Sequence, residues 1–474
     1  MRRRSAGYDG PQRGIVRGPS MRRGGAGSTY GARRLLPGSA SPAAYGVRVM
    51  PHRGGPASPV SNRFSVNGDA NYCNMRVESI SIRNFRGIED DRIVFDRRTT
   101  AFVGVNGVGK STILDAIAIA LSQLIWRISG HPLKARPIAI DDIRHGTEYA
   151  RIDACVRIGE SSVQWAIATN RRKGSYPDAE RKSDLDGLNE LVKGLLVVRE
   201  LIESDSPGVY SLPLAVYYDV NRAVLEIPVR VREKLRNSPS EVYKDALDHG
   251  GADFKRFFIW FRNREDIENE QRRDRPRYRD RALEAVRRAV AEFTGFDELR
   301  IRRSPLRMTV MKNGLEFNVE QLSDGERNML ALVGDMARRL SVLNPGLSNP
   351  NDGEGVVLID EIDLHLHPKW QREVVSKLEK TFPHCQFIIT THSPQVVGEL
   401  EAESVMLLRD GKLLGRALRS LGMSSNTVLE ELMEGEGRNH RVKRLLNVIH
   451  RLLEGERIAD AERLLGRLQD KVGE

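Results

Sequence analysis

Nine residues beginning at position 104 have the types and spacing of a loop that binds phosphate groups. They read Gly104-Val105-Asn106-Gly107-Val108-Gly109-Lys110-Ser111-Thr112 and fit the pattern G-x4-G-K-[S/T]. Successive backbone N–H groups of such a loop converge on phosphate oxygens at the positive end of a helix dipole. We expect Lys110 to reach the β- and γ-phosphates and Ser111 to bind Mg²⁺. The other residues expected to hold the nucleotide are Gly104, Asn106, Gly107, Gly109 and Thr112.

A second pattern is a short apolar run that ends in two acids, Gly355-Val356-Val357-Leu358-Ile359-Asp360-Glu361. A buried strand that releases a carboxylate at its end would place Asp360 beside the Mg²⁺ of the phosphate loop. Glu361 could then polarise a water against the γ-phosphate. Many strands end in acids, so the pattern alone is weak. It becomes specific because it lies 250 residues after Lys110.

Two further motifs complete an ordered set. The run Leu322-Ser323-Asp324-Gly325-Glu326-Arg327 opens an amphipathic helix, where Ser323 and Glu326 form a capping box. His392 follows the apolar run Phe387-Ile388-Ile389 and two threonines. A lone histidine is more often structural, but this one stands fourth in the set.

In this order the motifs resemble those of the ABC-type ATPases, whose signature reads LSGGQ or LSxGE. The resemblance implies ATP and Mg²⁺ as cofactors, and a homodimer or higher homo-oligomer. It implies that Ser323 and Gly325 bind the γ-phosphate of ATP held by the opposite subunit. Glu361 and His392 would be the catalytic residues, the histidine contacting the γ-phosphate, and Ser111 and Asp360 the metal ligands.

The elements that must position these residues predict an α/β fold. Strand patterns begin at Met75, a helix is predicted over residues 111–129, and residues 152–167 alternate as a hairpin. The apolar runs at residues 212–218, 356–359 and 387–389 are typical of strands covered on both faces. We expect a P-loop ABC-type ATPase with a mixed β-sheet core, an antiparallel β subdomain, an inserted helical region and a C-terminal helical hairpin.

The predicted organisation has five parts. They are a disordered tail at residues 1–74, the N-terminal half of the ATPase domain at 75–225, a helical insertion at 226–298, the C-terminal half at 299–420 and a helical region at 421–474. The helical insertion contains an aromatic stripe at helical spacing, which is interpreted as core rather than as a base-stacking platform. The stripe consists of Phe254, Phe257, Phe258 and Phe261.

Two family elements fit less well. Residues 362–368 occupy the place of the D-loop, but His367 stands where transporters carry Asp. His365 and His367 lack a third ligand nearby, so a metal site there is disfavoured. The glutamine of the Q-loop cannot be placed, and the turn Asp219-Val220-Asn221-Arg222 is the best candidate.

Spacing separates this chain from transporter subunits, because Lys110 and Ser323 lie 213 residues apart. The opening run at residues 80–87 looks like that of the RecF, SMC and OLD-type ATPases. Within that branch the chain resembles the AAA_21-like ATPases of bacterial defence, specifically the PtuA type of Septu and retron anti-phage systems. The residues behind this resemblance are the runs 141–144, 217–222, 258–270, 360–368, 425–426 and 429–431.

The net charge of +11 lies almost entirely in the tail. Residues 1–74 hold 12 Arg and 2 Asp and carry +10, and the rest of the chain carries +1. With 13 Gly and 7 Pro, the tail cannot bury enough apolar surface to order. It could touch nucleic acid, or be only a solvated segment or an early start codon.

Composition excludes an integral membrane protein, because no apolar run approaches the ~20 residues that span a bilayer. Three scattered cysteines suit a reducing cytoplasm. Two functions stay open. The first is a defence ATPase or a RecF-like repair ATPase that engages DNA, RNA or a nuclease. The second is a slow ATP-sensing assembly protein. The PtuA resemblance implies an HNH-type nuclease partner in trans. We expect no nuclease in this chain itself.

Overall fold

The computed structural model describes residues 75–129, 134–172, 174, 176–193, 210–220, 238–248, 254–433 and 440–472. The predicted tail at residues 1–74 lies outside this described part. So do Asn221 and Arg222, the second half of the Q-loop candidate.

A six-stranded mixed sheet carries the motifs, as predicted, in the order β13-β12-β3-β11-β10-β6. Five strands run parallel and β13 pairs antiparallel with β12. Every residue of β3, β6, β10 and β11 is buried, which explains their continuous apolar runs. The strands are β3 (Thr99–Val103), β6 (Leu214–Tyr218), β10 (Gly355–Ile359), β11 (Cys385–Thr391), β12 (Val405–Arg409) and β13 (Lys412–Arg416).

Two antiparallel sheets accompany it. The first has the order β2-β1-β4-β5, and Gln386 of β11 ties it to the central sheet by accepting from Val77 N (2.8 Å) and donating to Val77 O (3.0 Å). The second has the order β7-β8-β9. The strands are β1 (Arg76–Phe85), β2 (Ile88–Val94), β4 (Tyr149–Ile158), β5 (Ser161–Asn170), β7 (Asp297–Arg303), β8 (Leu306–Lys312) and β9 (Leu315–Asn318).

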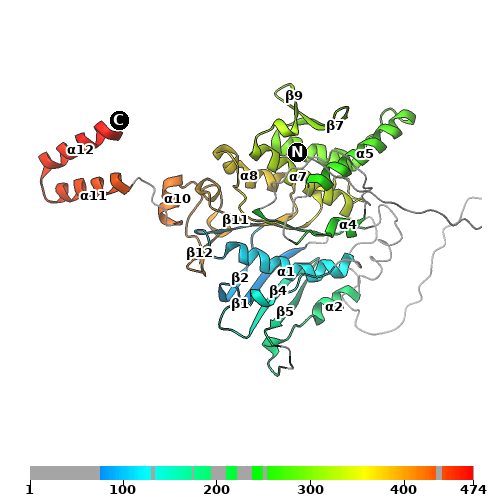
Figure 1. Cartoon of the computed structure of the whole chain (residues 1–474), viewed down its shortest axis with the longest axis horizontal. Helices are drawn as coiled ribbons and strands as arrows, with labels where there is room; N and C mark the ends of the chain where they lie inside the picture. The colour runs from blue at the N-terminus through cyan, green and yellow to red at the C-terminus, as the bar shows by residue number, and fades with distance from the viewer. Residues whose placement is uncertain are drawn as a thin grey trace, which may run out of the picture. The chain divides into compact units, whose positions relative to one another are not determined.

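Helices cover both faces of the central sheet. Helix α1 (Lys110–Ser129) runs between this sheet and the four-stranded sheet, and α7 (Asp324–Leu343) lies on the opposite face (Figure 1). Helix α1 is long and apolar enough by composition to cross a membrane, although charged residues interrupt it, so it contains no continuous apolar run of that length. However, 72% of its most apolar window is buried inside the protein. The shorter helices near these layers are α2 (Asp186–Lys193), α4 (Pro239–Tyr243), α8 (Pro368–Thr381), α9 (Pro394–Val397) and α10 (Ser425–Glu431).

The aromatic stripe belongs to α5 (Phe254–Asp274), and its four phenylalanines are buried, so its interpretation as core is confirmed. The stripe packs near α7, because a Cβ on Gly334 would lie 2.7 Å from the ring of Phe257. Helix α6 (Arg281–Thr294) follows and also packs on α7. Between β8 and β9, Asn313 and Gly314 take positive φ angles of 52° and 76°, so this Asn-Gly pair forms the turn of a β-hairpin.

The C-terminal pair of helices is also present, as α11 (His440–Glu454) and α12 (Ile458–Val472). Ile449, Ala461 and Leu468 form a small cluster of their own between the two helices. The predicted helical hairpin is therefore confirmed.

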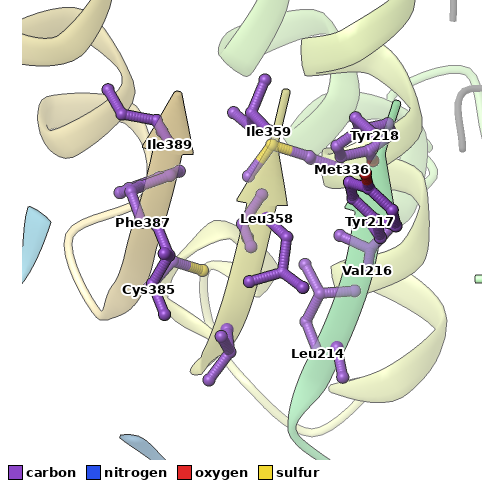
Figure 2. Close-up of a cluster of buried hydrophobic side chains, with 14 of the residues drawn as sticks. Leu214, Val216, Tyr217, Tyr218, Met336, Leu358, Ile359, Cys385, Phe387 and Ile389 are labelled. Atoms are coloured by element: carbon purple, nitrogen blue, oxygen red, sulfur yellow. The ribbon is translucent and has the colours of Figure 1, made fainter. Parts of the chain in front are cut away.

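Three parallel strands and α7 share a cluster of buried side chains. Figure 2 shows Leu214, Val216 and Tyr217 of β6 beside Leu358 and Ile359 of β10, with β11 on the other side of β10 and Met336 of α7 close to Tyr218. All of these side chains are buried. Such packing holds the ends of β10 and β6 in a fixed relation.

Glu354 directly precedes β10. One oxygen of its carboxylate, Oε2, is buried and has no hydrogen-bond partner among the described residues. Burial raises the pKa of Glu354 to about 7, although a backbone hydrogen bond from Met75 lowers it in part. Because the folded-state pKa is raised, the folded protein holds the proton more tightly. Its stability therefore falls as pH rises from the ordinary value of Glu through about 7.

We therefore expect Glu354→Gln to raise the melting temperature at pH 8 by about 2–4 °C. The gain should vanish near pH 4.5, where the wild-type carboxyl is protonated in the folded state. Thermal unfolding at both pH values measures it, with the exposed Glu292→Gln on α6 as control. An equal shift at both pH values would contradict the assignment to burial of the charge.

Candidate active site

The phosphate loop joins β3 to α1, as its sequence predicts. Gly107 and Gly109 take φ angles of 79° and 102°, which residues with side chains rarely adopt. A Cβ built on either of them would meet no atom within 4 Å, so the space beside the loop is open to a ligand. Gly104 is required for a different reason, since a Cβ there would lie 2.4 Å from the carbonyl oxygen of Leu408 on β12.

Lys110 lies folded across its own loop. Its Nζ donates to the carbonyl oxygens of Gly104 (2.9 Å) and Val105 (3.0 Å), and the residue is only 5% exposed. Burial lowers the pKa of Lys110, and the carboxylates of Asp360, Glu361 and Asp363 oppose that shift. The ammonium group is therefore poised to exchange carbonyl acceptors for phosphate oxygens.

Ser111 is exposed in the first turn of α1, and Thr112 beside it is half-buried. No hydrogen bond or ion pair involving the Ser111 hydroxyl is found within the described part of the chain. Asn106 is exposed on the loop.

The two acids after β10 are held by one hydroxyl of the neighbouring strand. Thr390 Oγ1 donates to Asp360 Oδ1 (2.5 Å) and accepts from the backbone N–H of Glu361 (2.7 Å). Asp360 is 3% exposed, and its own N–H donates to Tyr218 O at 2.9 Å. Glu361 has a φ of 47°, an uncommon value for a residue with a side chain, which turns the chain sharply after Asp360.

His392 faces Glu361, with 3.8 Å between His392 Nε2 and Glu361 Oε1. Asp363 Oδ1 fixes the start of this segment by accepting from Thr391 Oγ1 (2.6 Å) and His392 N (3.3 Å). Burial, then the charge of Lys110, lowers the pKa of His392, and nearby carboxylates oppose the shift. A lowered pKa favours the neutral imidazole, whose remaining N–H can donate to a phosphate oxygen.

The signature residues occupy the start of α7. Ser323 is exposed and caps the helix, with Glu326 N donating to Ser323 Oγ (3.4 Å) and Ser323 N donating to Glu326 Oε2 (3.1 Å). Lys312 holds Glu326 at 2.6 Å. Gly325 is buried against the D-loop, because a Cβ there would lie 2.5 Å from the carbonyl oxygen of His365. Within the described ranges, no hydrogen bond or ion pair joins Ser323 or Gly325 to the phosphate loop of the same chain.

His365 and His367 have structural positions. His365 takes a φ of 62°, and His367 Nδ1 accepts from Lys369 N (3.3 Å), which caps α8. The part of the chain that the structure describes contains no group of three His, Cys, Asp or Glu side chains placed to hold a metal by themselves. Asp219, in the Q-loop candidate, is buried directly after β6, the strand paired with β10.

Several residues that position the site were not singled out from the sequence. Thr390 and Asp363 lie inside recognised motifs. The sequence signal for Thr390 is the threonine pair Thr390-Thr391 just before His392. The signal for Asp363 is its position two residues after the acidic pair Asp360-Glu361. Asp115 gave a weaker one, four residues after Ser111 on α1. It is 3% exposed and accepts from Arg86 (2.5 Å) and Arg136 (2.8 Å), which fixes α1 to two distant segments.

The residues present fit a nucleotide with Mg²⁺. Magnesium prefers oxygen ligands and keeps several waters, and the exposed Ser111 hydroxyl and the Asp360 carboxylate supply oxygen. Asp360, Glu361 and Asp363 lie close enough to Lys110 to act on its pKa, so the site holds more negative than positive charge. A divalent cation would offset that excess.

Comparisons with known proteins match the part of the chain that contains these site residues. The AAA_21 family, described as "AAA domain, putative AbiEii toxin, Type IV TA system", matches residues 99–398. The "Retron Ec83 probable ATPase" of Escherichia coli is 33% identical, with 84% of each chain covered. The "Septu protein PtuA" of Bacillus mycoides is 28% identical over 70% of this chain and 40% of its own length. The solved SMC head bound to the C-terminal winged-helix domain of ScpA covers 72% of this chain and 98% of its own, at 18% identity and a TM-score of 0.39.

Proposed function

The chain belongs to the AAA_21 family of AAA domains, and on this premise we propose that it binds ATP with Mg²⁺ and hydrolyses it. The observation that carries the proposal is the meeting of three motifs, the phosphate loop, the two acids after β10 and His392, at one end of the central sheet. Lys110, Asp360, Glu361 and His392 come from three neighbouring strands and the loops that follow them, and they act on one another at short range.

The geometry supports a role for each of these residues. The open N–H groups of the loop, with Lys110, would bind the phosphates, and Ser111 with Asp360 would hold Mg²⁺, which neutralises charge on the phosphate oxygens when bound. Glu361 would orient a water and accept its proton. Thr390 keeps Asp360 and Glu361 in fixed relation, so metal binding and water activation share one support.

We further propose that two chains pair head to tail around two ATP molecules. Support comes from the start of α7, where Ser323 is exposed and the positive end of the helix dipole is suited to an anion. Gly325 allows that turn to lie directly against the D-loop. The signature of one chain would then complete the nucleotide site of the other, in a homodimer or a higher homo-oligomer built from such pairs.

Mixing two inactive chains tests this arrangement. Lys110→Ala weakens the nucleotide site and Ser323→Arg blocks the signature, so each variant alone should have little activity at ATP concentrations that just saturate the wild type. In an equal mixture half of the pairs are mixed and hold one intact site each, so about a quarter of wild-type turnover should return.

The matched control mixes Lys110→Ala with the double variant Lys110→Ala/Ser323→Arg, which can form no intact site. Phosphate release measures all mixtures. Folded variants that show no rescue at any ratio would contradict the paired arrangement.

The relatives support a role for the chain in bacterial anti-phage defence, since they carry retron and Septu names. We propose that ATP turnover in the cytoplasm regulates an HNH-type nuclease supplied in trans, with DNA or RNA as a further partner. The RecF-like opening strand at residues 80–87 favours DNA repair as the second candidate. A slow ATP-sensing assembly protein is the third. Measuring ATP turnover with and without DNA or RNA distinguishes a repair ATPase from a slow ATP-sensing assembly protein.

A further inference from the structure

A buried cluster of charges lies in the middle of α7. Asp335 is fully buried and accepts from Arg338 Nη2 (2.6 Å), Arg339 Nε (2.6 Å) and the hydroxyl of Tyr218 (3.0 Å). The two arginines are 4% and 2% exposed. Arg339 also donates to the carbonyl oxygen of Val242 in α4. We call Tyr218, Asp335, Arg338 and Arg339 the Asp335 cluster.

The cluster joins two parts of the proposed machinery. Tyr218 is the last residue of β6, and its carbonyl oxygen accepts the N–H of Asp360 at 2.9 Å. Figure 2 shows its ring reaching toward Met336 of α7, which follows Asp335 in the chain. One residue thus contacts the metal-binding turn through its backbone and the signature helix through its side chain. Asp335 lies 12 residues after Ser323, or about 18 Å along the helix axis.

Stability does not account for such a cluster. Burying an aspartate with two arginines costs desolvation that well-packed apolar residues would avoid. Buried apolar residues precede and follow Asp335 along α7, including Leu332, Met336 and Leu340, so the helix already packs in an apolar environment. Hydrogen bonds fix direction as well as distance, whereas apolar contacts tolerate sliding. The cluster therefore sets the rotation and axial position of α7 against β6.

We propose that Tyr218 is a positioning residue that holds the signature at the start of α7 in register with the strand end beside Asp360. The inference rests on the proposed ATP-bridged pair, in which Ser323 and Gly325 serve the opposite chain. A slide of α7 along its axis would displace Ser323 from the partner's nucleotide and strain the bond to Tyr218. Tyr218 thereby links the signature that a chain presents to the metal site that it contains.

The test is Tyr218→Phe in the full chain, which removes one hydroxyl and keeps the ring. ATP affinity should stay within about twofold, because the phosphate loop is untouched. Turnover at saturating ATP should fall about tenfold, because a misplaced signature costs the reaction more than binding. Tyr243→Phe is the matched control: it removes a buried hydroxyl that donates to Pro213 O at 2.7 Å, and should lower thermal stability similarly without this loss of turnover.

Mixed pairs locate the effect. With Tyr218→Phe on the Lys110→Ala chain, which supplies only the signature, rescue of the Ser323→Arg chain should fall about tenfold. With Tyr218→Phe on the Ser323→Arg chain, rescue should persist. Turnover of Tyr218→Phe equal to that of Tyr243→Phe, or a loss confined to the second mixture, would overturn the inference. A wild-type chain that does not hydrolyse ATP would instead refute the proposed function.

Discussion

Glu361→Gln is expected to bind ATP as tightly as the wild-type chain and to hydrolyse it about a thousandfold more slowly, within the range that a general base contributes. The amide keeps the shape of the side chain but cannot take a proton from water. Its position should persist, because the contact with Thr390 is made by the backbone N–H of residue 361. Equilibrium binding of ATP and steady-state phosphate release measure the two halves of the prediction.

Glu399→Gln is the matched control for that variant. Glu399 is a partly exposed acid that pairs with Arg372 at 3.0 Å, outside the phosphate-binding site. Its replacement should leave both binding and turnover unchanged. Normal hydrolysis by Glu361→Gln would show that another group activates the water.

Lys110→Ala should weaken ATP binding about 100-fold, the scale set by losing a charged hydrogen-bonding group. The loss has two sources. The ammonium group no longer meets the phosphates, and the carbonyl oxygens of Gly104 and Val105 lose the donor that organises the loop. Helix α1 should remain folded, because its packing depends on the apolar residues that follow Lys110.

Calorimetric titration with ATP and Mg²⁺ measures this effect. Lys193→Ala is the control, since Lys193 is exposed at the end of α2. Equal affinity in Lys110→Ala and wild type would place the nucleotide elsewhere in the molecule.

Short-range patterns allowed much of the fold to be predicted from sequence. The buried strands are continuous apolar runs, and α1, α7, α11 and α12 show helical periodicity over 15 or more residues. The capping box at Ser323 and the Asn313-Gly314 turn are also local. In each case the residues that determine the structure are neighbours in the chain, so the pattern is complete without knowledge of the tertiary packing.

The supporting contacts of the site could not be predicted in the same way. Thr390 holds Asp360 and Glu361 across 30 residues of sequence, and Tyr218 meets Asp335 across 117. Such pairs depend on which strands become neighbours, and sequence spacing carries no signal for that. Gly325 illustrates the difference, since its motif indicates phosphate binding, whereas its contact with the His365 carbonyl is visible only in the structure.

The most direct test of the account is single-turnover phosphate release from ATP by the full chain, compared between wild type and Glu361→Gln at equal occupancy. With Mg²⁺ the wild type should convert its bound ATP, while Glu361→Gln should hold ATP largely intact over the same time. With EDTA the wild type should fall to the level of the variant. Equal rates for the two chains with Mg²⁺, or a wild-type rate unaffected by EDTA, would contradict the assignment of Lys110, Asp360 and Glu361 to one hydrolytic site.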